Sequence, residues 1–433
     1  MFYIRRLGLE LIRQPGIARI GLMFPSVTLK KMTEITDRTT TGEPARYRVL
    51  VICNDSAYFL RHRLYLVIHL VSIGVDVTVM TGGPPIPAER IQGWEYIHLR
   101  MERFRFDPIG DIALAVRTIR AIRSLKPDAV HLITLKPAIF SGLASVVTRF
   151  FHGYPKRILI TLPGLGRMMS WSKGSGERRY PVGRALTILA MRFLARCDSV
   201  HFSFETKHDR DFWMKRGIAN HKNSSVLDGA GVDLNLFYPL ETARSNSKTK
   251  IIYASRLLKS KGLNAFLMMA RDLANRPDVE FIVAGLADDQ DPDAIRPEDL
   301  NQLGEIRFLG QVDDMPPLLR ECDIVCLPTR YGEGIPRILI EAAASGLASI
   351  VSDHPGCRAV VEDGVTGQVL SAKADFEMSR KLSAALVRYL EDPDLLTQHK
   401  RAAYQAFQAR EFSQDACVAR FTELLGWPRD VPA

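Results

Sequence analysis

Short apolar runs alternate with amphipathic stretches along most of the chain. Six runs of five to seven residues, rich in Val, Ile, Leu and aromatic side chains, predict buried strands in the first half: 47–53, 76–80, 95–99, 129–134, 157–162 and 199–204. The stretches between them carry apolar residues at helical spacing, as residues 110–125 do. Strands that alternate with helices predict a parallel sheet with helices on both faces.

The same alternation resumes after residue 250. Residues 228–239 are rich in Gly, Asn and Asp, the residues that follow them are polar, and together they predict a linker. Further strands are predicted at 251–255, 280–285, 306–310, 323–329, 349–353 and 367–370. Helices are predicted over 262–275, from about residue 336, and over 376–426 with one interruption near 391–394. Because 433 residues are too many for one ordinary core, we expect an α/β fold of two Rossmann-like domains that face one another across a cleft.

Positive charge is concentrated in two segments. The chain has 58 Lys and Arg residues against 48 Asp and Glu residues, a net charge of +10. Residues 1–31 carry six basic residues and one Glu, and residues 167–196 carry seven basic residues and one Glu. Both segments are also rich in apolar residues, and 182–196 has the pattern of an amphipathic helix edged by arginines. This combination favours an anionic membrane surface as a partner. A buried helix whose arginines reach water, or a contact between protomers, gives the same pattern.

Several classes of protein are disfavoured. No window approaches the ~20 uninterrupted apolar residues that a membrane span needs, and the first residues lack the long apolar core and cleavage site of a secretory signal. The basic segments contain no recognisable nucleic-acid module, and the six scattered cysteines suit a reducing compartment. We therefore expect a cytoplasmic protein that lies peripherally at the inner face of the cytoplasmic membrane and binds no nucleic acid.

Two glutamates eight positions apart flank a predicted helix start. Glu333 lies between two glycines, and Pro336 suits a first helical turn, where its missing N–H has no partner to lose. A helix that begins beyond a strand's carboxyl end offers N–H groups and a partial positive charge to a phosphate. Glu341 lies on the flank of this helix's apolar face. From the spacing alone, Glu341 is either a ligand contact or an ion-pair partner of Arg337, which lies one turn earlier in the helix.

A basic turn follows the first predicted strand of the second domain. Arg256 and Lys261 occupy this turn, where a guanidinium and an ammonium could together neutralise a diphosphate. Exposed basic loops are common, so the turn alone does not distinguish a binding site from solvated surface. The acidic loop at 288–293 contains Asp-x-Asp patterns, but we interpret it as solvated surface rather than a metal site.

The order of these features resembles a known family. SRLLKSKGL (255–263), the run 306–346 and DHPGCRAVVEDGVTGQVL (353–370) together resemble the carboxyl-terminal domain of family 4 retaining glycosyltransferases, which have the GT-B fold. The paired glutamates match that family's E-x7-E pattern. FLRHRLYL (59–66), PDAVHLITLKPAIFSGL (127–143) and LPGLGR (162–167) resemble a bacterial branch that extends lipid-linked glycans for surface polysaccharides or protein glycosylation.

The resemblance covers residues 46–427 and, with the pattern of elements, implies five parts. They are a basic amphipathic extension (1–45), an acceptor-binding Rossmann-like domain (46–236), a linker (237–249), a nucleotide-sugar-binding Rossmann-like domain (250–396) and a helical segment (397–433) that packs back on the first domain.

The resemblance also implies roles for single residues. Arg256 and Lys261 would hold the donor diphosphate, Glu333 would contact the donor sugar, and Glu341 would contact the nucleotide ribose. Other donor contacts would come from the turn before the helix and from the loop near the base: Gly334, Ile335, Pro336, Arg337, Gly310 and Val312.

The first domain supplies the remaining candidates. His131 matches a histidine region that faces the cleft in the family and is a catalytic candidate. The loop after the first strand lacks the double glycine that many members have, which leaves Arg61, His62 and Arg63 as candidate acceptor or phosphate contacts.

The implied activity is a retaining, metal-independent transfer without a cofactor. A sugar would move from a nucleotide-sugar, with a UDP-sugar favoured, to a polyprenyl-diphosphate-linked saccharide. The alternatives are a noncatalytic nucleotide-sugar-binding subunit, a transferase with a soluble acceptor, and another two-domain enzyme such as an epimerase or dehydrogenase. A dehydrogenase is disfavoured because G-x-G-x-x-G does not follow the first predicted strand.

Overall fold

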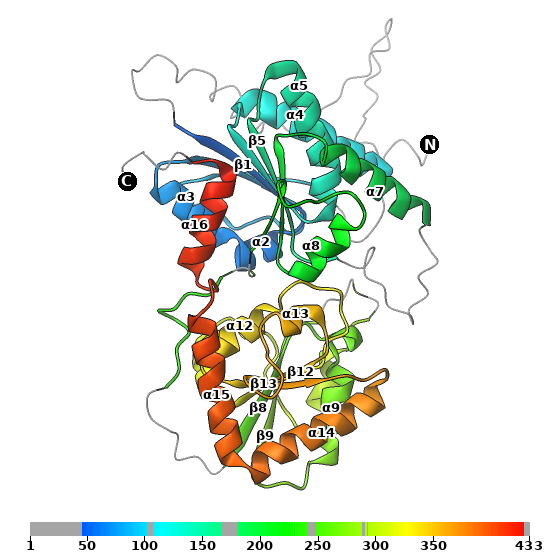
Figure 1. Ribbon diagram of the computed structural model, residues 1–433, viewed down its shortest axis with the longest axis vertical. Coiled ribbons are helices and arrows are strands. Elements are labelled where there is room, and N and C mark those ends of the chain that lie inside the picture. The colour runs from blue at the N-terminus through cyan, green and yellow to red at the C-terminus, as the bar shows by residue number, and fades with distance from the viewer. Residues whose placement is uncertain are drawn as a thin grey trace, which may run out of the picture.

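The computed structural model describes residues 46–101, 107–165, 181–227, 229, 231–240, 248–287, 291 and 293–427. These residues form two lobes, each built around one parallel sheet (Figure 1). The predicted α/β architecture of two parallel-sheet domains is confirmed. The extension 1–45 and the basic residues 167–180 lie outside the described residues.

The first lobe holds a seven-stranded sheet in the order β3-β2-β1-β4-β5-β6-β7. Its strands are β1 (Arg48–Cys53), β2 (Asp76–Thr81), β3 (Glu95–His98), β4 (Ala129–Ile133), β5 (Arg157–Leu162), β6 (Val200–Phe204) and β7 (Ser224–Val226). The sequence predicted all but β7, whose three residues include two serines and are too few to show an apolar pattern.

Helices cover both faces of this sheet. They are α2 (Ser56–His62), α3 (Leu64–Ser72), η2 (Ala88–Arg90), α4 (Pro108–Leu125), η3 (Pro137–Ser141), α5 (Gly142–His152), α7 (Pro181–Leu194) and α8 (Lys207–Met214). Alternate residues of β1 belong to different apolar clusters, with Leu50 in one and Val51 in the other. The cluster of Leu50 lies under α4, α5 and α7, and that of Val51 lies under α3.

The second lobe has a six-stranded sheet in the order β10-β9-β8-β11-β12-β13 and one large apolar core. Its strands are β8 (Thr249–Ala254), β9 (Val279–Ala284), β10 (Arg307–Phe308), β11 (Ile324–Leu327), β12 (Ala348–Ser352) and β13 (Gly367–Leu370). Its helices are η4 (Lys259–Lys261), α9 (Leu263–Asp272), α10 (Pro297–Asn301), α11 (Met315–Arg320), α12 (Arg337–Ala344), α13 (Pro355–Arg358) and α14 (Asp375–Glu391). Within the described residues of both lobes, no helix is long and apolar enough to cross a membrane.

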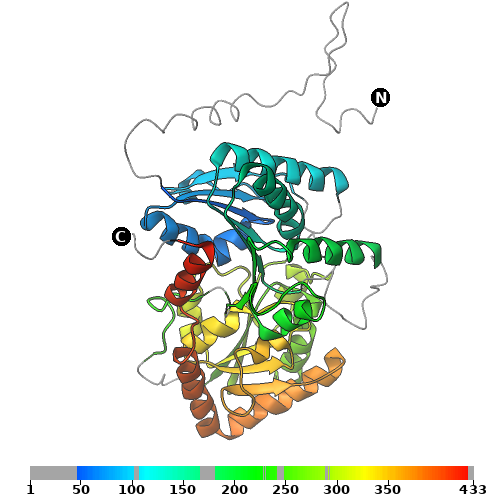
Figure 2. The same ribbon diagram turned by 45° about the horizontal axis from the view of Figure 1, so that its top comes forward.

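The chain returns to the first lobe at its carboxyl end. Helix α15 (Pro393–Gln408) packs against α12 and β12 of the second lobe, whereas α16 (Gln414–Leu425) packs against α3, β4 and β5 of the first (Figures 1 and 2). Val232 bonds through its main chain to Phe412 at 2.9 Å and Gln414 at 3.0 Å, so the two crossings between the lobes lie side by side. The predicted division at residue 397 falls inside α15. The sequence pattern did not predict the break between α15 and α16 at 409–413. The hydrogen bonds of this segment with Val232 join residues that lie far apart in the sequence, so the local pattern does not show them.

Phe421→Ala should destabilise the first lobe. Phe421 is 1% exposed, and its ring centroid lies 5.4 Å from the His131 ring centroid and 5.3 Å from the Arg63 guanidinium carbon. Loss of the ring leaves a cavity under α16, so the free energy of unfolding should fall by about 3–5 kcal/mol. Tryptophan fluorescence during denaturation reports this lobe, because Trp94 and Trp213 lie in its cores.

The control for this prediction is Phe376→Ala on α14, where the side chain is 64% exposed. This substitution should change the free energy of unfolding by less than about 0.5 kcal/mol. Equal effects of the two substitutions would contradict the docking of α16.

Candidate functional site

The start of α12 lies directly against the first lobe. Gly334 donates its backbone N–H to the carbonyl oxygen of Pro163 at 2.9 Å. A Cβ on Gly334 would lie only 2.5 Å from that oxygen and from the carboxylate of Glu205, so glycine allows this close approach. Pro163 and Glu205 directly follow strands β5 and β6, and Gly334 lies in the loop after β11. The carboxyl ends of strands from both sheets therefore meet here, where ligands bind in open α/β folds.

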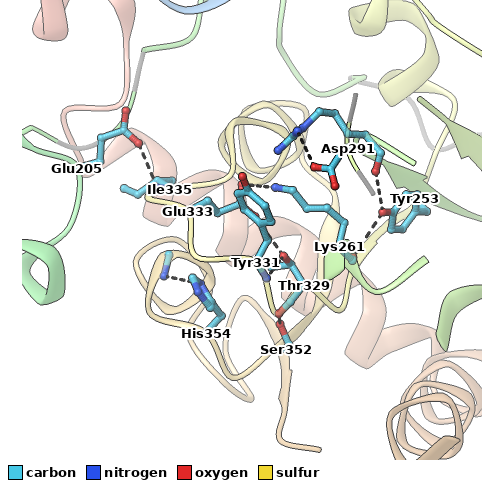
Figure 3. A network of polar contacts seen from close by, with 12 residues as sticks. Glu205, Tyr253, Lys261, Asp291, Thr329, Tyr331, Glu333, Ile335, Ser352 and His354 are labelled. Carbon is cyan, nitrogen blue, oxygen red and sulfur yellow. Dashed lines mark hydrogen bonds and ion pairs between the residues drawn. The ribbon is translucent and has the colours of Figure 1, made fainter. Parts of the chain in front are cut away.

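Lys261 and Glu333 form an ion pair at this meeting point (Figure 3). Lys261 is 6% exposed, and Glu333 also accepts a hydrogen bond from the Thr329 hydroxyl at 3.2 Å. Gly262 follows the lysine with φ at +80°, and a Cβ there would overlap the carbonyl oxygen of Pro328. The glycine lets the basic turn lie against the end of β11, which places the ammonium beside the carboxylate.

Arg256 lies at the other end of the same turn. Its guanidinium is 3.7 Å from the carboxylate of Asp291, which is 2% exposed. The Tyr331 ring lies 5.1 Å from the Arg256 guanidinium carbon and 5.0 Å from the Lys261 ammonium, within the range of cation–π attraction. The Tyr253 hydroxyl bonds to the carbonyl oxygens of Arg256 and Lys261 at 3.3 and 3.4 Å (Figure 3). The structure therefore brings the two predicted diphosphate-binding cations together.

The acidic loop at 288–293 corrects one prediction. Asp291 is buried rather than solvated, because its ion pair with Arg256 offsets the cost of removing a carboxylate from water. Asp293 accepts a hydrogen bond from the backbone N–H of Ser260 at 2.7 Å. The described part of this loop therefore braces the basic turn. Across the described residues, no group of three or more His, Cys, Asp or Glu side chains is arranged to hold a metal ion.

Glu341 pairs with Arg337 inside α12. The Arg337 Nε donates to a carboxylate oxygen of Glu341 at 2.7 Å, and its Nη1 donates to the backbone carbonyl of Arg61 in the first lobe. Burial raises the pKa of Glu341, while Arg337 and Arg61 act in the opposite direction. The ion pair between Glu341 and Arg337, one of the two possibilities that the spacing allowed, is therefore present. Arg337 also links the two lobes.

The last turn of α2 carries Arg61 and His62 of the first lobe. Arg61 is exposed at this end of the helix, and the His62 ring contacts the Tyr58 ring in a tilted arrangement with centroids 4.5 Å apart. Burial and the nearby charges of Arg337, Arg63, Arg61 and Lys261 hold the pKa of His62 well below its usual range. His62 is therefore neutral at pH 7, among arginine and lysine side chains that come from both lobes.

Glu205 is a residue that the sequence analysis missed. One carboxylate oxygen accepts from Arg63 Nη2 at 3.1 Å. The other accepts from the backbone N–H of Ile335 at 3.2 Å, as Figure 3 shows. Both charged side chains are buried, which corrects the expectation that Arg63 is a substrate contact. Burial raises the pKa of Glu205 to about 7, although Arg63 and the Ile335 N–H favour the carboxylate. The position of Glu205 directly after a predicted strand was the available signal.

His131 does not reach this site. It occupies the middle of β4, paired in register between Val51 and Leu159, rather than the end of the strand. Its Nε2 bonds to the Thr161 hydroxyl at 2.8 Å, and its side chain is fully buried against Phe421. Burial lowers its pKa to about 3, so the imidazole is neutral. The structure assigns His131 to the core, in contrast to the predicted catalytic role.

The remaining candidates lie at the ends of other strands in the second lobe. Gly310 follows β10 with φ at +64°, and its carbonyl oxygen accepts from the N–H of Gly285 at 2.7 Å. Val312 lies two residues further on and packs partly on the core. His354, which the sequence analysis did not select, lies near Glu333 and accepts from the Gly356 N–H at 3.2 Å (Figure 3).

Glu205→Gln should alter the pH dependence of stability. Because the folded-state pKa of Glu205 lies above its ordinary value of 4.5, its contribution to stability is present below pH 4.5 and lost as pH rises through about 7. The free energy of unfolding of the unsubstituted chain, relative to that of Glu205→Gln, should fall by up to about 1.4 kcal/mol per pH unit in this window.

Urea denaturation of both proteins from pH 4.5 to 8 measures this difference. Glu89→Gln, at an exposed position of η2, controls for the loss of one carboxylate. Glu205→Gln also removes the ion-pair partner of Arg63. This removal shifts the difference in the free energy of unfolding by a constant amount and leaves its slope against pH unchanged. A difference that stays level across the window would contradict the buried carboxylate.

Comparison with known proteins matches each lobe separately. The model "Glycosyl transferase 4-like" matches residues 48–173, and the model "Glycosyl transferases group 1" matches residues 248–392. The sucrose-phosphate synthase of Thermosynechococcus elongatus has a similar structure, with a TM-score of 0.68 and 18% identity over 88% of this chain and 98% of that one. This similarity shows the GT-B fold.

Two curated relatives are similar over part of the chain. The N,N'-diacetylbacillosaminyl-diphospho-undecaprenol alpha-1,3-N-acetylgalactosaminyltransferase of Campylobacter jejuni is 30% identical over 52% of this chain and 59% of its own length. The phosphatidyl-myo-inositol mannosyltransferase of Mycolicibacterium smegmatis is 35% identical over 44% of this chain and 43% of its own length. The chain thus spans about half the length of these relatives. The first lobe thus matches the family 4-like glycosyltransferase model, the second lobe matches the group 1 glycosyltransferase model, and the two lobes together have the GT-B fold.

Proposed function

We propose that the chain transfers a sugar from a nucleotide-sugar, with a UDP-sugar favoured, to a polyprenyl-diphosphate-linked saccharide. The observation that carries this proposal is the pair of cations, Arg256 and Lys261, which both lie within about 5 Å of the Tyr331 ring, with Lys261 paired to Glu333 just before the start of α12. Two cations at one turn suit a diphosphate, because its negative charge is spread over two phosphate groups. Membership of a glycosyltransferase family supports the donor class.

The leaving group explains the need for these cations. When the bond between the anomeric carbon and the diphosphate breaks, the electron pair stays on the phosphate oxygen and negative charge grows there. Arg256, Lys261 and the N–H groups at the start of α12 would stabilise that charge. In this proposal no metal takes part, the acceptor hydroxyl attacks the same face of the sugar that the diphosphate leaves, and the hydroxyl proton passes to the departing phosphate oxygen. The anomeric configuration is then retained.

The remaining donor contacts follow from the placement of side chains. Glu333 would bind the sugar hydroxyls beside Lys261, and Glu341 would bind the ribose after the Arg337 side chain shifts. Gly310 and Val312 would lie beside the base. Glu333 is not proposed as a nucleophile, because its carboxylate is already held by Lys261 and Thr329.

The acceptor would approach from the first lobe, where Arg61 and His62 are candidate contacts. The name of the Campylobacter relative specifies a diphospho-undecaprenol acceptor, and that of the mycobacterial relative a phosphatidylinositol. Both acceptors are lipids with a phosphate in the headgroup. We extend this class of acceptor to the present chain, which would then work at the inner face of the cytoplasmic membrane.

One experiment distinguishes this proposal from two alternatives, a noncatalytic binding subunit and a transferase with a soluble acceptor. A matrix of UDP-, GDP- and ADP-sugars against polyprenyl-diphosphate-linked saccharides and soluble oligosaccharides, read by product mass, identifies the donor and acceptor. No product from any pair, together with saturable donor binding, indicates a noncatalytic binding subunit. Product from soluble acceptors alone indicates the second alternative. Turnover that survives EDTA supports transfer without a metal, and its loss would contradict that part of the proposal.

Glu333→Gln and Lys261→Ala should each lower kcat/KM by about 10²- to 10³-fold, because each removes a charged contact to the developing transition state. Initial rates with the donor identified in the matrix measure the effect. Circular dichroism tests whether both variants stay folded. Lys259→Ala is the matched control, since Lys259 lies in the same turn with an exposed side chain. Full activity in both site variants would place the site elsewhere.

A further inference from the structure

Three helices of the first lobe share one outer layer. Helices α4, α5 and α7 lie next to one another on the same side of the sheet (Figures 1 and 2). Of the seventeen large hydrophobic side chains that are exposed among the described residues, nine lie on these three helices. They are Ile109, Ile112, Val116, Val147, Phe150, Phe151, Leu186, Leu189 and Phe193. We call the outward side of this layer the α4–α5–α7 surface.

The exposed apolar side chains are not needed by the core. On α7, Leu186, Leu189 and Phe193 follow helical spacing on the exposed side, while Met191 and Leu194 are buried against the sheet. A surface helix of a globular domain ordinarily has one apolar stripe. At the end of α5, Phe150 is 84% exposed and Phe151 is 72% exposed. The layer therefore carries a second apolar face that the fold itself does not bury, of the kind that marks interaction sites.

Charge on the same helices has one sign. Their arginines are Arg117, Arg120, Arg123, Arg149, Arg184 and Arg192. The one acidic residue among them, Asp111, is buried and bonds to the Lys136 ammonium at 2.8 Å. The α4–α5–α7 surface thus combines exposed apolar side chains with positive charge and presents no exposed carboxylate of its own helices.

We propose that the α4–α5–α7 surface binds an anionic lipid bilayer. Phenylalanine and aliphatic side chains can enter the boundary between headgroups and acyl chains, while arginines remain among the phosphates. A protein partner of the same chain fits less well, because two copies of this surface would bring like charges together. The sequence pattern indicated residues 1–31, which lie outside the described residues, and residues 167–196, which include α7. The structure adds α4 and α5 to the surface.

The surface reaches the edge of the lobe that carries the candidate site. Helices α4 and α7 follow strands β3 and β5, so each begins on the side of the sheet where parallel strands end. Ile109 and Leu186 lie near these beginnings, and Pro163 of the site directly follows β5. Binding of the bilayer at this surface would place a lipid-linked acceptor near the site. This role of the surface rests on the proposed function. Lipid binding itself needs no transfer.

Flotation of the full chain with phosphatidylcholine vesicles, with and without phosphatidylglycerol, tests the proposal. The unsubstituted protein should float with the anionic vesicles. The double variant Phe150→Ser/Phe151→Ser and the double variant Arg117→Glu/Arg120→Glu should each bind at least about tenfold more weakly. Phe376→Ser, an exposed phenylalanine on α14 of the second lobe, is the control and should float like the unsubstituted protein.

Three results would overturn the proposal: unchanged flotation of both double variants, equal binding to neutral vesicles, or a dimer in solution that the Phe150→Ser/Phe151→Ser variant dissociates. Transfer to a short-chain, water-soluble acceptor analogue without vesicles separates the two hypotheses. Both double variants should keep the rate of the unsubstituted protein in that assay. Absent transfer with intact lipid binding would contradict the proposed function, whereas normal transfer with unchanged flotation of the variants would contradict the membrane surface.

Discussion

The structure depends on the contact between the start of α12 and the first lobe. Gly334 and Ile335 give their N–H groups to the carbonyl of Pro163 and the carboxylate of Glu205. These acceptors follow β5 and β6, so the contact joins the carboxyl ends of two separate sheets. These two N–H groups precede Pro336, the N-cap residue of α12. A donor phosphate that used them would have to replace both acceptors of the first lobe, whereas the N–H groups of the first helical turn, from Arg337 on, lie outside this contact.

Carboxylates keep the cations of the site in place. Asp291 holds Arg256, Glu333 holds Lys261, Glu341 holds Arg337, and Glu205 holds Arg63. Removing charged side chains from water is costly, so buried pairs of this kind add little to stability. Their consequence is geometric, because each cation is fixed before a ligand arrives and loses less conformational freedom on binding. A donor diphosphate would exchange one set of anions for another at Arg256 and Lys261.

The local pattern of the sequence contained most of the fold but only part of the site. Continuous apolar runs predicted twelve of the thirteen strands among the described residues, because both faces of a parallel sheet are buried. Arg256, Lys261 and Glu333 could be selected as candidates because each follows a predicted strand in a turn with glycine, and the family resemblance supplied their roles. Glu205 also follows a predicted strand, but its partners, like the partner of Asp291, could not be identified because they lie far away in the sequence. His131 was placed wrongly for a related reason, because a histidine in the middle of an apolar strand has the same local pattern as one near its end. The packing of Phe421 from the last helix decides between them.

The arginines of the site and those of the α4–α5–α7 surface have different electrostatic environments. The difference is whether a carboxylate pairs with the arginine. At the site, Arg256, Arg337 and Arg63 each pair with a buried or partly buried carboxylate, so the field of these arginines is largely cancelled until a ligand replaces that partner. On the α4–α5–α7 surface, the helices supply six arginines and one carboxylate, which is buried and bonded to Lys136. A field of one sign extends about 8–10 Å into solvent at physiological salt, far enough to attract an anionic surface before contact. Affinity of the surface should then depend steeply on salt, whereas the site's ion pairs, shielded from solvent, should not. The two groups of arginines can therefore act on different ligands of the same charge, one through long-range attraction and the other through fixed geometry.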